Sequence, residues 1–525
     1  MTFPILTVLA FLPALGALAL IFIRGALAKQ VALVVSLLVL LIALILAARF
    51  TIGGGMQFSE QASWIKALGA YYALGLDGIG LTLVLLVSIV TPVVIVASWR
   101  DFDRKKKAGS SRGSNAPGPG ADLAPKYEAH VFFALVLAVE TCALFLFLAT
   151  DVFLFYVFFE VILVPMYFLI GGFGPGPRRT YAAAKFLIFG LLGGFVMLAS
   201  VIGLYALSAG AGEASYLLST LSQLRIGTGT GRWLFIGFMF AFAIKAPLVP
   251  LHTWLPDAAE ESSPGGAVMM VGVMDKIGTF GMIRFCLGLF PEASRWATPV
   301  VLVLAVVSII YGAILAIGSK DLMRFIAYTS ISHFGFIVLG IFAFTSQSLV
   351  GSTLYMLNHG LSTAALFVAA GYLIKRRGSR SIDDYGGVDR VAPVLAGLLL
   401  FAGLSTLSLP GLSSFVSEFM VLAGTFSRHP AYAVVSTLAV VLAALYILIA
   451  YQRTMTGPVQ PAVEGMTDLT RRERLAMAPL VFLIVLLGLF PKPMLSIIEP
   501  AVQSAMQHVG VSDPQPRVGA EGGRR

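Results

Sequence analysis

The chain has 525 residues, of which 58% are hydrophobic and only 12% are charged. Soluble globular domains carry about 25% charged residues, so this composition excludes an ordinary soluble enzyme or binding module. The net charge of +10 at pH 7 would suggest a nucleic-acid partner in a soluble protein, but here it indicates basic loops beside a membrane. The two cysteines, Cys142 and Cys286, lie in apolar runs without a metal-ligand or disulfide pattern.

Fourteen apolar segments follow one another along the chain. Most are long enough to cross a bilayer, which takes about 20 apolar residues. They predict an all-α polytopic membrane protein with about 14 transmembrane helices. The segments lie at 3–23, 30–50, 74–98, 129–149, 152–172, 181–208, 232–255, 265–289, 298–317, 322–344, 349–374, 391–424, 431–453 and 476–497.

The same segments divide the chain into six parts. The longest break between them, 100–128, is basic and then rich in Gly, Pro and Ser, which predicts a mobile loop. The predicted parts are an N-terminal three-helix segment (1–99), this basic loop (100–128), a first five-helix repeat (129–289), a second five-helix repeat (298–453), a loop with the last helix (454–497) and a polar tail (498–525).

Lysine and arginine are unequally distributed between alternate loops. If the N-terminus lies outside, the inside loops hold 20 of these residues and the outside loops hold four, the tail excepted. Cytoplasmic loops of membrane proteins carry the excess of basic residues. We therefore expect both termini on the outer side and the 100–128 loop in the cytoplasm.

Two segments contain helix-breaking residues in mid-span. The seventh has Pro247 and Pro250, and the twelfth has Pro410 followed by Gly411. A break frees backbone N–H and C=O groups, which are costly in hydrocarbon unless protein or water satisfies them. Paired broken helices are typical of transporter repeats. Because the breaks are an odd number of segments apart, we expect two inverted five-helix repeats.

Four ionisable residues lie inside predicted spans, namely Glu160, Lys245, Lys276 and Glu418. A charge at bilayer depth costs at least about 2.5–3.5 kcal/mol, so such residues are functional candidates by default. A buried Glu–Lys pair has two states, charged when close and neutral when apart, because burial disfavours charge and an opposite charge favours it. A change in the distance between the partners therefore moves a proton.

Three histidines, His252, His333 and His359, lie in or beside the same spans. A neutral imidazole accepts a proton at one nitrogen and donates from the other, and it titrates near neutral pH. A single buried histidine is more often a packing residue, but three of them beside Glu and Lys favour a proton relay. Two further acids in the spans, Glu140 and Asp275, are secondary candidates.

The sequence carries no visible redox chemistry of its own. It contains no metal-ligand cluster, no phosphate-binding glycine loop and no cysteine set for haem or an iron–sulfur cluster. We therefore expect the chain to bind neither a metal nor a cofactor.

Several stretches that carry these residues resemble the antiporter-like subunits of respiratory complex I. The resemblance covers about residues 70–497, and its motifs occur in the expected order. They are ATDVFLFYVFFEVILVPMYFLI, KAPLVPLHTWLPDA, KDLMRFIAYTSISHFGF and NHGLSTAALF. Three paralogues, L, M and N, share this core. Glu418 makes the chain similar to subunit M, because L and N carry lysine on the twelfth helix.

The resemblance implies a proton-translocating subunit of NADH:quinone oxidoreductase that is driven by redox chemistry in other subunits. Glu160 would be the partner of Lys245, the switching lysine on the broken seventh helix. Lys276 would be the central lysine, and Glu418 the terminal residue toward the outer exit. The three histidines would carry water-linked proton transfer. Asp151 matches an acidic residue at the outer start of the fifth helix.

The resemblance also implies a bacterial plasma-membrane location and a set of partners. These are the other complex I subunits, especially L and N on either side, and the lipid bilayer, but no nucleic acid. FMN, iron–sulfur clusters and quinone are expected in partner subunits. The sequence departs from the family pattern at Asp275, Glu140 and the 100–128 loop.

Three alternatives remain open. A subunit of a multisubunit Na⁺/H⁺ antiporter shares this core, although Glu418 argues against it, because such chains carry lysine there. A membrane-bound hydrogenase subunit also shares the core. The third alternative is a structural membrane scaffold whose buried charges serve only pairing between helices.

Overall fold

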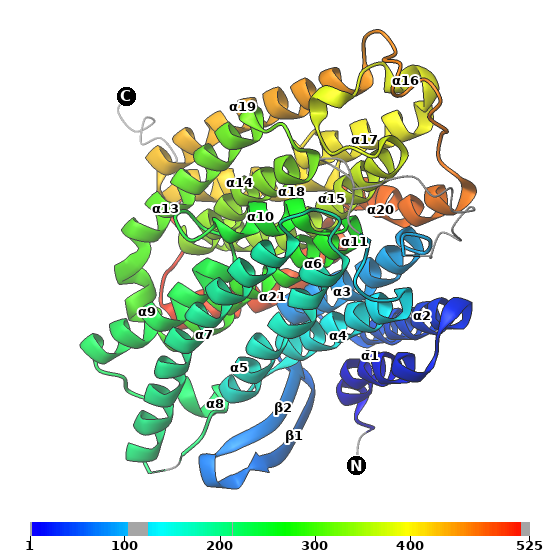
Figure 1. The fold of residues 1–525 in the computed structure, drawn as a ribbon. Coiled ribbons are helices and arrows are strands. Elements are labelled where there is room, and N and C mark those ends of the chain that lie inside the picture. The colour runs from blue at the N-terminus through cyan, green and yellow to red at the C-terminus, as the bar shows by residue number, and fades with distance from the viewer. Residues whose placement is uncertain (1–2, 103–123, 213, 516–525) are drawn as a thin grey trace, which may run out of the picture.

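The computed structural model describes residues 3–102, 124–212 and 214–515 of the chain. Most of the predicted 100–128 loop therefore lies outside the described residues. The rest forms a bundle of helices, and a two-stranded hairpin lies beside α5 and α8 at one edge of the bundle (Figure 1).

The bounds of the elements follow the chain order. The strands are β1 (Gln57–Ile65) and β2 (Ala70–Leu76). The 3₁₀ turns are η1 (Lys66–Leu68) and η4 (Ile382–Asp384), and the π-helical stretches are η2 (Val268–Met274) and η3 (Met282–Leu287). The α-helices are α1 (Ile5–Phe22), α2 (Gly25–Arg49), α3 (Gly78–Ala97), α4 (Ala129–Leu148), α5 (Val152–Val161), α6 (Leu163–Phe173), α7 (Arg179–Gly210), α8 (Leu218–Leu221), α9 (Thr228–Lys245), α10 (Trp254–Glu261), α11 (Pro264–Ala267), α12 (Lys276–Gly281), α13 (Pro291–Gly318), α14 (Leu322–Phe342), α15 (Ser346–Arg377), α16 (Val388–Val391), α17 (Pro393–Thr406), α18 (Ser413–Arg428), α19 (Pro430–Met455), α20 (Arg471–Leu489) and α21 (Lys492–Val509).

Eleven helical segments in the described part of the chain are long and apolar enough to cross a membrane. The number is twelve if α20 and α21, which are bent by 71° at their junction, count as one span. These twelve correspond to twelve of the fourteen predicted segments. The other two, 232–255 and 391–424, are the segments with helix breakers, and the chain divides them into shorter helices.

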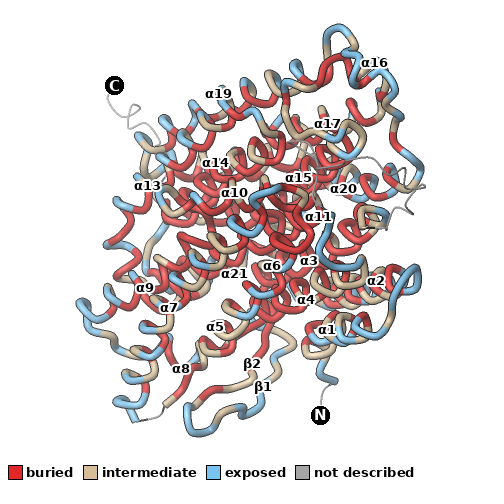
Figure 2. The backbone as a smooth tube through the Cα atoms, viewed as in Figure 1, coloured by how far each residue is buried: buried red, intermediate tan, exposed pale blue. Residues whose placement is uncertain are grey.

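Burial separates an inner set of helices from an outer set. Nearly all residues are buried in α3, α14, α15 and the stretch from α11 to η3, whereas only about a third of the residues are buried in α1, α2 and α19 (Figure 2). The exposed side chains of the outer helices are largely Leu, Ile, Val and Phe. An apolar exterior around a packed interior is the pattern expected of helices that face lipid. The buried ionisable residues lie mainly on the inner helices and on those that pack against them.

The prediction of an all-α fold is wrong at residues 57–76, where β1 and β2 pair antiparallel. The β1 sequence QFSEQASWI is too polar to form a membrane helix, and its residues pair with the apolar β2 instead. Gly69 closes the turn with φ +60°, a conformation that favours glycine. The hairpin also holds the start of α1, because Glu60 accepts hydrogen bonds from the backbone N–H of Leu6 and Thr7 at 2.7 and 3.0 Å.

The C-terminal boundary also differs from the prediction. The last helix, α21, continues to Val509 through residues assigned to the polar tail. It is amphipathic, with Ile498, Val502, Met506 and Val509 buried. These positions repeat every three or four residues and therefore form one apolar stripe, which packs on α3 and α15.

At the first predicted break, α9 ends at Lys245 and α10 begins at Trp254. Polar groups freed by the break find partners within the protein. The indole N–H of Trp254 donates to the Ile244 carbonyl at 2.9 Å, and the N–H of Val249 donates to Ser308 Oγ at 2.9 Å. These bonds offset the cost of unpaired backbone groups at this depth.

At the second predicted break, α17 ends at Thr406 and α18 begins at Ser413. Ser408 and Gly411 adopt positive φ angles of 62° and 93° in the connection. Asn358 on α15 donates to the Ser413 carbonyl at 2.7 Å. The chain therefore leaves the helix at both places where the sequence contains breakers.

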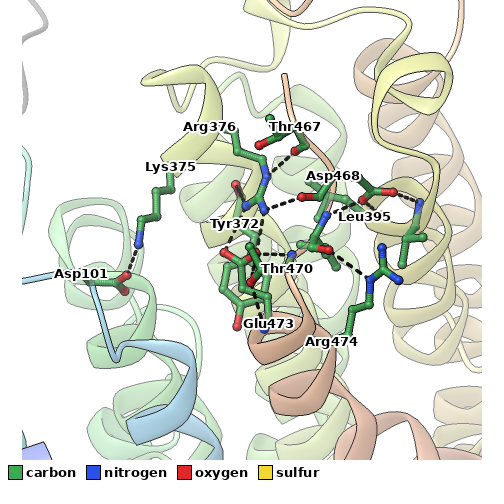
Figure 3. A network of polar contacts seen from close by, with 12 residues as sticks. Asp101, Tyr372, Lys375, Arg376, Leu395, Thr467, Asp468, Thr470, Glu473 and Arg474 are labelled. Atoms are coloured by element: carbon green, nitrogen blue, oxygen red, sulfur yellow. Dashed lines mark hydrogen bonds and ion pairs between the residues drawn. The ribbon is translucent and has the colours of Figure 1, made fainter. Parts of the chain in front are cut away.

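A polar network fixes the C-terminal end of α15 against the start of α20 (Figure 3). Arg376 forms an ion pair with Glu473 at 2.7 Å and also donates to the carbonyls of Thr467 and Asp468. The side chains of this pair are only 10% and 6% exposed. Lys375 pairs with Asp101 at 2.7 Å, which joins the end of α15 to the segment after α3.

Candidate functional site

The centre of the candidate site is Lys276, the first residue of α12. It is fully buried and follows the seven-residue π-helical stretch η2, a departure from α geometry that is frequent at functional sites. Its Nζ donates to the Val271 carbonyl at 2.6 Å and lies 2.8 Å from His359 Nδ1 on α15. The same ammonium lies 5.1 Å from the centre of the Phe334 ring. The predicted central lysine and one predicted histidine are thus in direct contact.

A second set of contacts extends from the histidines to Glu418. The rings of His359 and His333 have centroids 5.4 Å apart. His333 Nδ1 lies 2.7 Å from the hydroxyl oxygen of Tyr355, which donates to Glu418 Oε2 at 2.6 Å. Ser408, in the second break, donates to the same carboxylate oxygen at 2.6 Å. The second half of the protein therefore brings three predicted residues together through Tyr355, which was not predicted.

Lys245 has different surroundings from Lys276. It is buried at the last turn of α9, and its Nζ has no hydrogen-bond partner among the described residues. It lies over the Phe159 ring, 4.4 Å from the centroid, which gives a cation–π contact. The predicted partner, Glu160, interacts with Lys245 electrostatically. It forms no ion pair with Lys245 within 4.0 Å in the described structure.

The secondary candidates Glu140 and Asp275 are both completely buried. The Asp275 carboxylate has no hydrogen-bond partner among the residues that the structure describes, whereas Glu140 lies beside the Thr91 hydroxyl. Asp275 interacts electrostatically with both Lys245 and Lys276. The Asp275 carboxylate could therefore exchange a proton with either lysine.

Two predicted residues lie apart from this series of contacts. His252 is in the connection between α9 and α10, with its ring 5.3 Å from that of Tyr311. Asp151 caps α5 by accepting from Leu154 N–H at 2.9 Å, and it also accepts from Tyr71 N–H at 3.0 Å. Burial raises the pKa of Asp151 to about 6, although these N–H groups act to lower it. Its contacts join α5 to the hairpin and support a structural role.

A charged cluster beside α10 was not predicted from the sequence. Asp257 accepts hydrogen bonds from Lys185 on α7, at 2.7 Å, and from Arg324 on α14. Burial acts to raise the pKa of Asp257, but the hydrogen bonds and charges of its two partners outweigh it and hold the pKa below its ordinary value. Arg324 also donates to Glu260 at 2.7 Å. The cluster joins the second part of the broken helix to α7 and α14.

The chemistry available to this arrangement is proton transfer. Carboxylates, imidazoles, a phenol and amines follow one another at the centre of the bundle, and each can gain or lose a proton. The described residues contain no group of three or more His, Cys, Asp or Glu side chains that could hold a metal ion. The contacts extend across α12, α14, α15 and α18, so a proton could move laterally between helices.

Comparison with known proteins identifies the family. Residues 149–445 match the model of the NADH:quinone oxidoreductase/Mrp antiporter transmembrane family. The chain is 51% identical to NADH-quinone oxidoreductase subunit M of Mycobacterium tuberculosis (strain CDC 1551 / Oshkosh), over 98% of this chain and 96% of that one.

Solved structures share the fold. A chain of respiratory complex I from Thermus thermophilus with bound NADH matches with a TM-score of 0.85 and 30% identity, over 96% of this chain and all of that chain. A chain of the Mrp complex from Dietzia sp. DQ12-45-1b matches with a TM-score of 0.80 and 22% identity, over 97% of this chain and all of that chain. The sequence and structural matches together show that the chain belongs to the NADH:quinone oxidoreductase/Mrp antiporter transmembrane family, in which it groups with the subunit M chains.

Proposed function

We propose that the chain is the proton-translocating membrane subunit M of a respiratory NADH:quinone oxidoreductase. The observation that carries the proposal is the 51% identity to NADH-quinone oxidoreductase subunit M over nearly the full length of both chains. The chain takes part in a translocase, while the redox reaction takes place in other subunits. FMN, iron–sulfur clusters and quinone belong to those partners in this proposal.

Within this function, Glu160 and Lys245 form the switching pair. Their separation beyond ion-pair distance fits a pair in its open state. Lys276 receives the proton and Glu418 releases it toward the outer side. His359, which contacts Lys276, and His333, which contacts Tyr355, lie between these two residues. They carry the proton from Lys276 toward Glu418.

The roles of the remaining candidates follow from their positions. Asp275 interacts electrostatically with both lysines and relays protons between them, and Glu140 on α4 is a further buried acid that can store a proton. His252 lies in the broken segment between α9 and α10 and interacts electrostatically with Lys185 of the charged cluster around Asp257, and we assign it proton transfer between that cluster and Lys245. Asp151 supports the start of α5 rather than the proton path.

The topology that we propose has fourteen spans. The seventh covers residues 232–255, from α9 to the start of α10, and the twelfth covers residues 391–424, with α17 and most of α18. Residues 129–289 and 298–453 are two five-helix repeats of opposite orientation. Both termini lie on the outer side of a bacterial plasma membrane, because the inside loops then hold 20 basic residues and the outside loops four.

The partners in the membrane are other complex I subunits, with the antiporter-like subunits L and N on either side. The candidate path runs laterally through the bundle, which suits a row of aligned subunits that influence one another electrostatically. A Na⁺/H⁺ antiporter or hydrogenase subunit is the second candidate function. The matched Mrp chain shares the fold at 22% identity, and the presence of Glu418 in place of lysine favours subunit M.

The test is a Lys245→Ala substitution in the intact complex, purified and reconstituted into vesicles. Lys320→Ala is the matched control, because Lys320 is exposed in the connection before α14. We expect Lys245→Ala to lose most NADH:quinone turnover and proton uptake, while NADH oxidation by a water-soluble acceptor continues because it does not require the membrane subunits. Normal pumping by Lys245→Ala would contradict the proposed mechanism and favour the scaffold alternative.

A further inference from the structure

The phenol of Tyr355 lies directly between the histidine pair and Glu418. Its oxygen is 2.7 Å from His333 Nδ1 and 2.6 Å from Glu418 Oε2. We propose that Tyr355 is the proton-relay residue through which the histidines reach Glu418, an inference that rests on the proposed function. Tyrosine has no place in the predicted series of Glu, Lys and His.

Among the described residues, no hydrogen bond joins either histidine directly to Glu418. The hydrogen-bonding contacts of the histidines run from Nδ1, to Lys276 for His359 and to Tyr355 for His333. The Nε2 atoms of both rings have no hydrogen-bond partner there. Glu418 in turn accepts from Tyr355 and Ser408 only on Oε2. Tyr355 is therefore the side chain that connects the two sets of contacts.

The position of Tyr355 is well defined. Its side chain is 1% exposed, and it lies on α15 one helical turn before His359, so both residues face the same side of the helix. Its ring makes an edge contact with the His333 ring, with centroids 5.8 Å apart. Ser408 holds the carboxylate oxygen that receives the Tyr355 hydrogen bond. The donor and acceptor atoms are thus placed before any proton moves.

The transfer step can be written without a charged tyrosine. Protonated His333 gives its Nδ1 proton to the Tyr355 oxygen as Tyr355 passes its own hydroxyl proton to the Glu418 carboxylate. One N–H bond and one O–H bond break while two O–H bonds form. The products are neutral His333, neutral Tyr355 and protonated Glu418. The starting arrangement returns when Glu418 releases its proton, the Tyr355 hydroxyl hydrogen rotates toward the carboxylate and His333 takes up a new proton.

The test compares Tyr355→Phe with Tyr446→Phe in the purified complex reconstituted into vesicles. Tyr446 is the matched control, because it is also 1% exposed and its hydroxyl has no hydrogen-bond partner in the described structure. We expect Tyr355→Phe to lower proton uptake and NADH:quinone turnover by about a hundredfold, the lower end of the ~10²–10⁴-fold contribution of a positioned proton-transfer group. Tyr446→Phe should retain both activities.

Two further measurements separate a relay from a packing role. Replacement of Tyr355 by a fluorotyrosine, which keeps the hydroxyl but makes it more acidic, should restore turnover and move its pH profile to lower pH. The rate of Tyr355→Phe should show a larger solvent deuterium isotope effect than the wild type, because proton transfer at this point becomes limiting. An unchanged pH profile with fluorotyrosine would overturn the relay.

Comparison with Lys245→Ala separates a failure of the Tyr355 relay from a failure of the proposed function of the subunit. If Tyr355→Phe pumps normally while Lys245→Ala does not, the tyrosine relay is wrong and the proposed function stands. If both variants pump normally, the proposed function itself is wrong. Blue-native electrophoresis and mass spectrometry of each purified complex show whether the variant subunit has assembled with its partners.

Discussion

Gly194 on α7 provides the space that the Glu160 carboxylate occupies. A Cβ atom at this position would lie 1.5 Å from Glu160 Oε1, whereas real Cβ contacts are essentially never shorter than 3.0 Å. A Gly194→Ala substitution must therefore displace the carboxylate by at least about 1.5 Å. The obstructing atom is the end of a flexible side chain, so we expect the subunit to fold and assemble.

The displacement changes the interaction of Glu160 with Lys245. Two unit charges about 5 Å apart at an effective dielectric constant of about 20 attract by about 3.3 kcal/mol. A change in separation of about 1.5 Å alters this by about 0.8 kcal/mol, which shifts the balance between the paired and open states about fourfold. We expect coupled NADH:quinone turnover and proton uptake to fall by about two- to fourfold.

The matched control is Gly203→Ala on the same helix. Its Cβ would lie 2.6 Å from the Leu234 side chain, so the packing is disturbed but no charge moves. The assay is dye-detected proton uptake into vesicles, with NADH:quinone turnover measured in the same preparation. Equal activities of Gly194→Ala and Gly203→Ala would refute the reasoning that the position of Glu160 controls pumping.

Two further predictions concern the polar clusters at the ends of the helices. Glu473→Gln leaves the buried guanidinium of Arg376 without its charged partner and should destabilise the subunit by about 3 kcal/mol. We expect a lower unfolding midpoint in calorimetry with unchanged turnover at 25 °C, and an unchanged midpoint would contradict this. Asp257→Asn weakens the charged hydrogen bonds to Lys185 and Arg324 and should cost about 1.5–3 kcal/mol. Because the folded pKa of Asp257 is lowered, its stabilisation is present above the ordinary carboxyl pKa of about 3.9 and is lost only as the pH falls through the folded pKa. The stability difference between the wild type and Asp257→Asn should therefore stay constant from pH 5 to 8, and a difference that vanishes within this range would contradict the ion pairs.

Much of the fold could be predicted because apolar length and helix breakers are local signals. Pro247 and Pro250 mark the end of α9, and Pro410 with Gly411 marks the connection between α17 and α18. The hairpin at 57–76 could not be recognised in the same way. Its first strand lies outside any apolar run, and its second strand is short and continuous with the apolar run that becomes α3.

The buried lysines, carboxylates and histidines of the candidate site could be predicted from the sequence, but Tyr355 could not. A lysine such as Lys276 is conspicuous in an apolar span because charge is costly there. Tyr355 is not conspicuous, since an aromatic residue in a membrane helix is ordinary, and only the positions of His333 and Glu418 reveal what its hydroxyl contacts. Lys185 was likewise missed, because its partner Asp257 is distant in the sequence.

The contacts of α15 limit how this protein can change shape. This uninterrupted helix of 32 residues is attached to its neighbours at several heights, by Tyr355, Asn358 and His359 along its middle and by Arg376 at its end. A piston-like shift by one turn, about 5.4 Å, would break all of these bonds together. We therefore expect α15 to stay in place during turnover. Conformational changes would then be confined to side-chain rotations and to the helix ends at the two breaks.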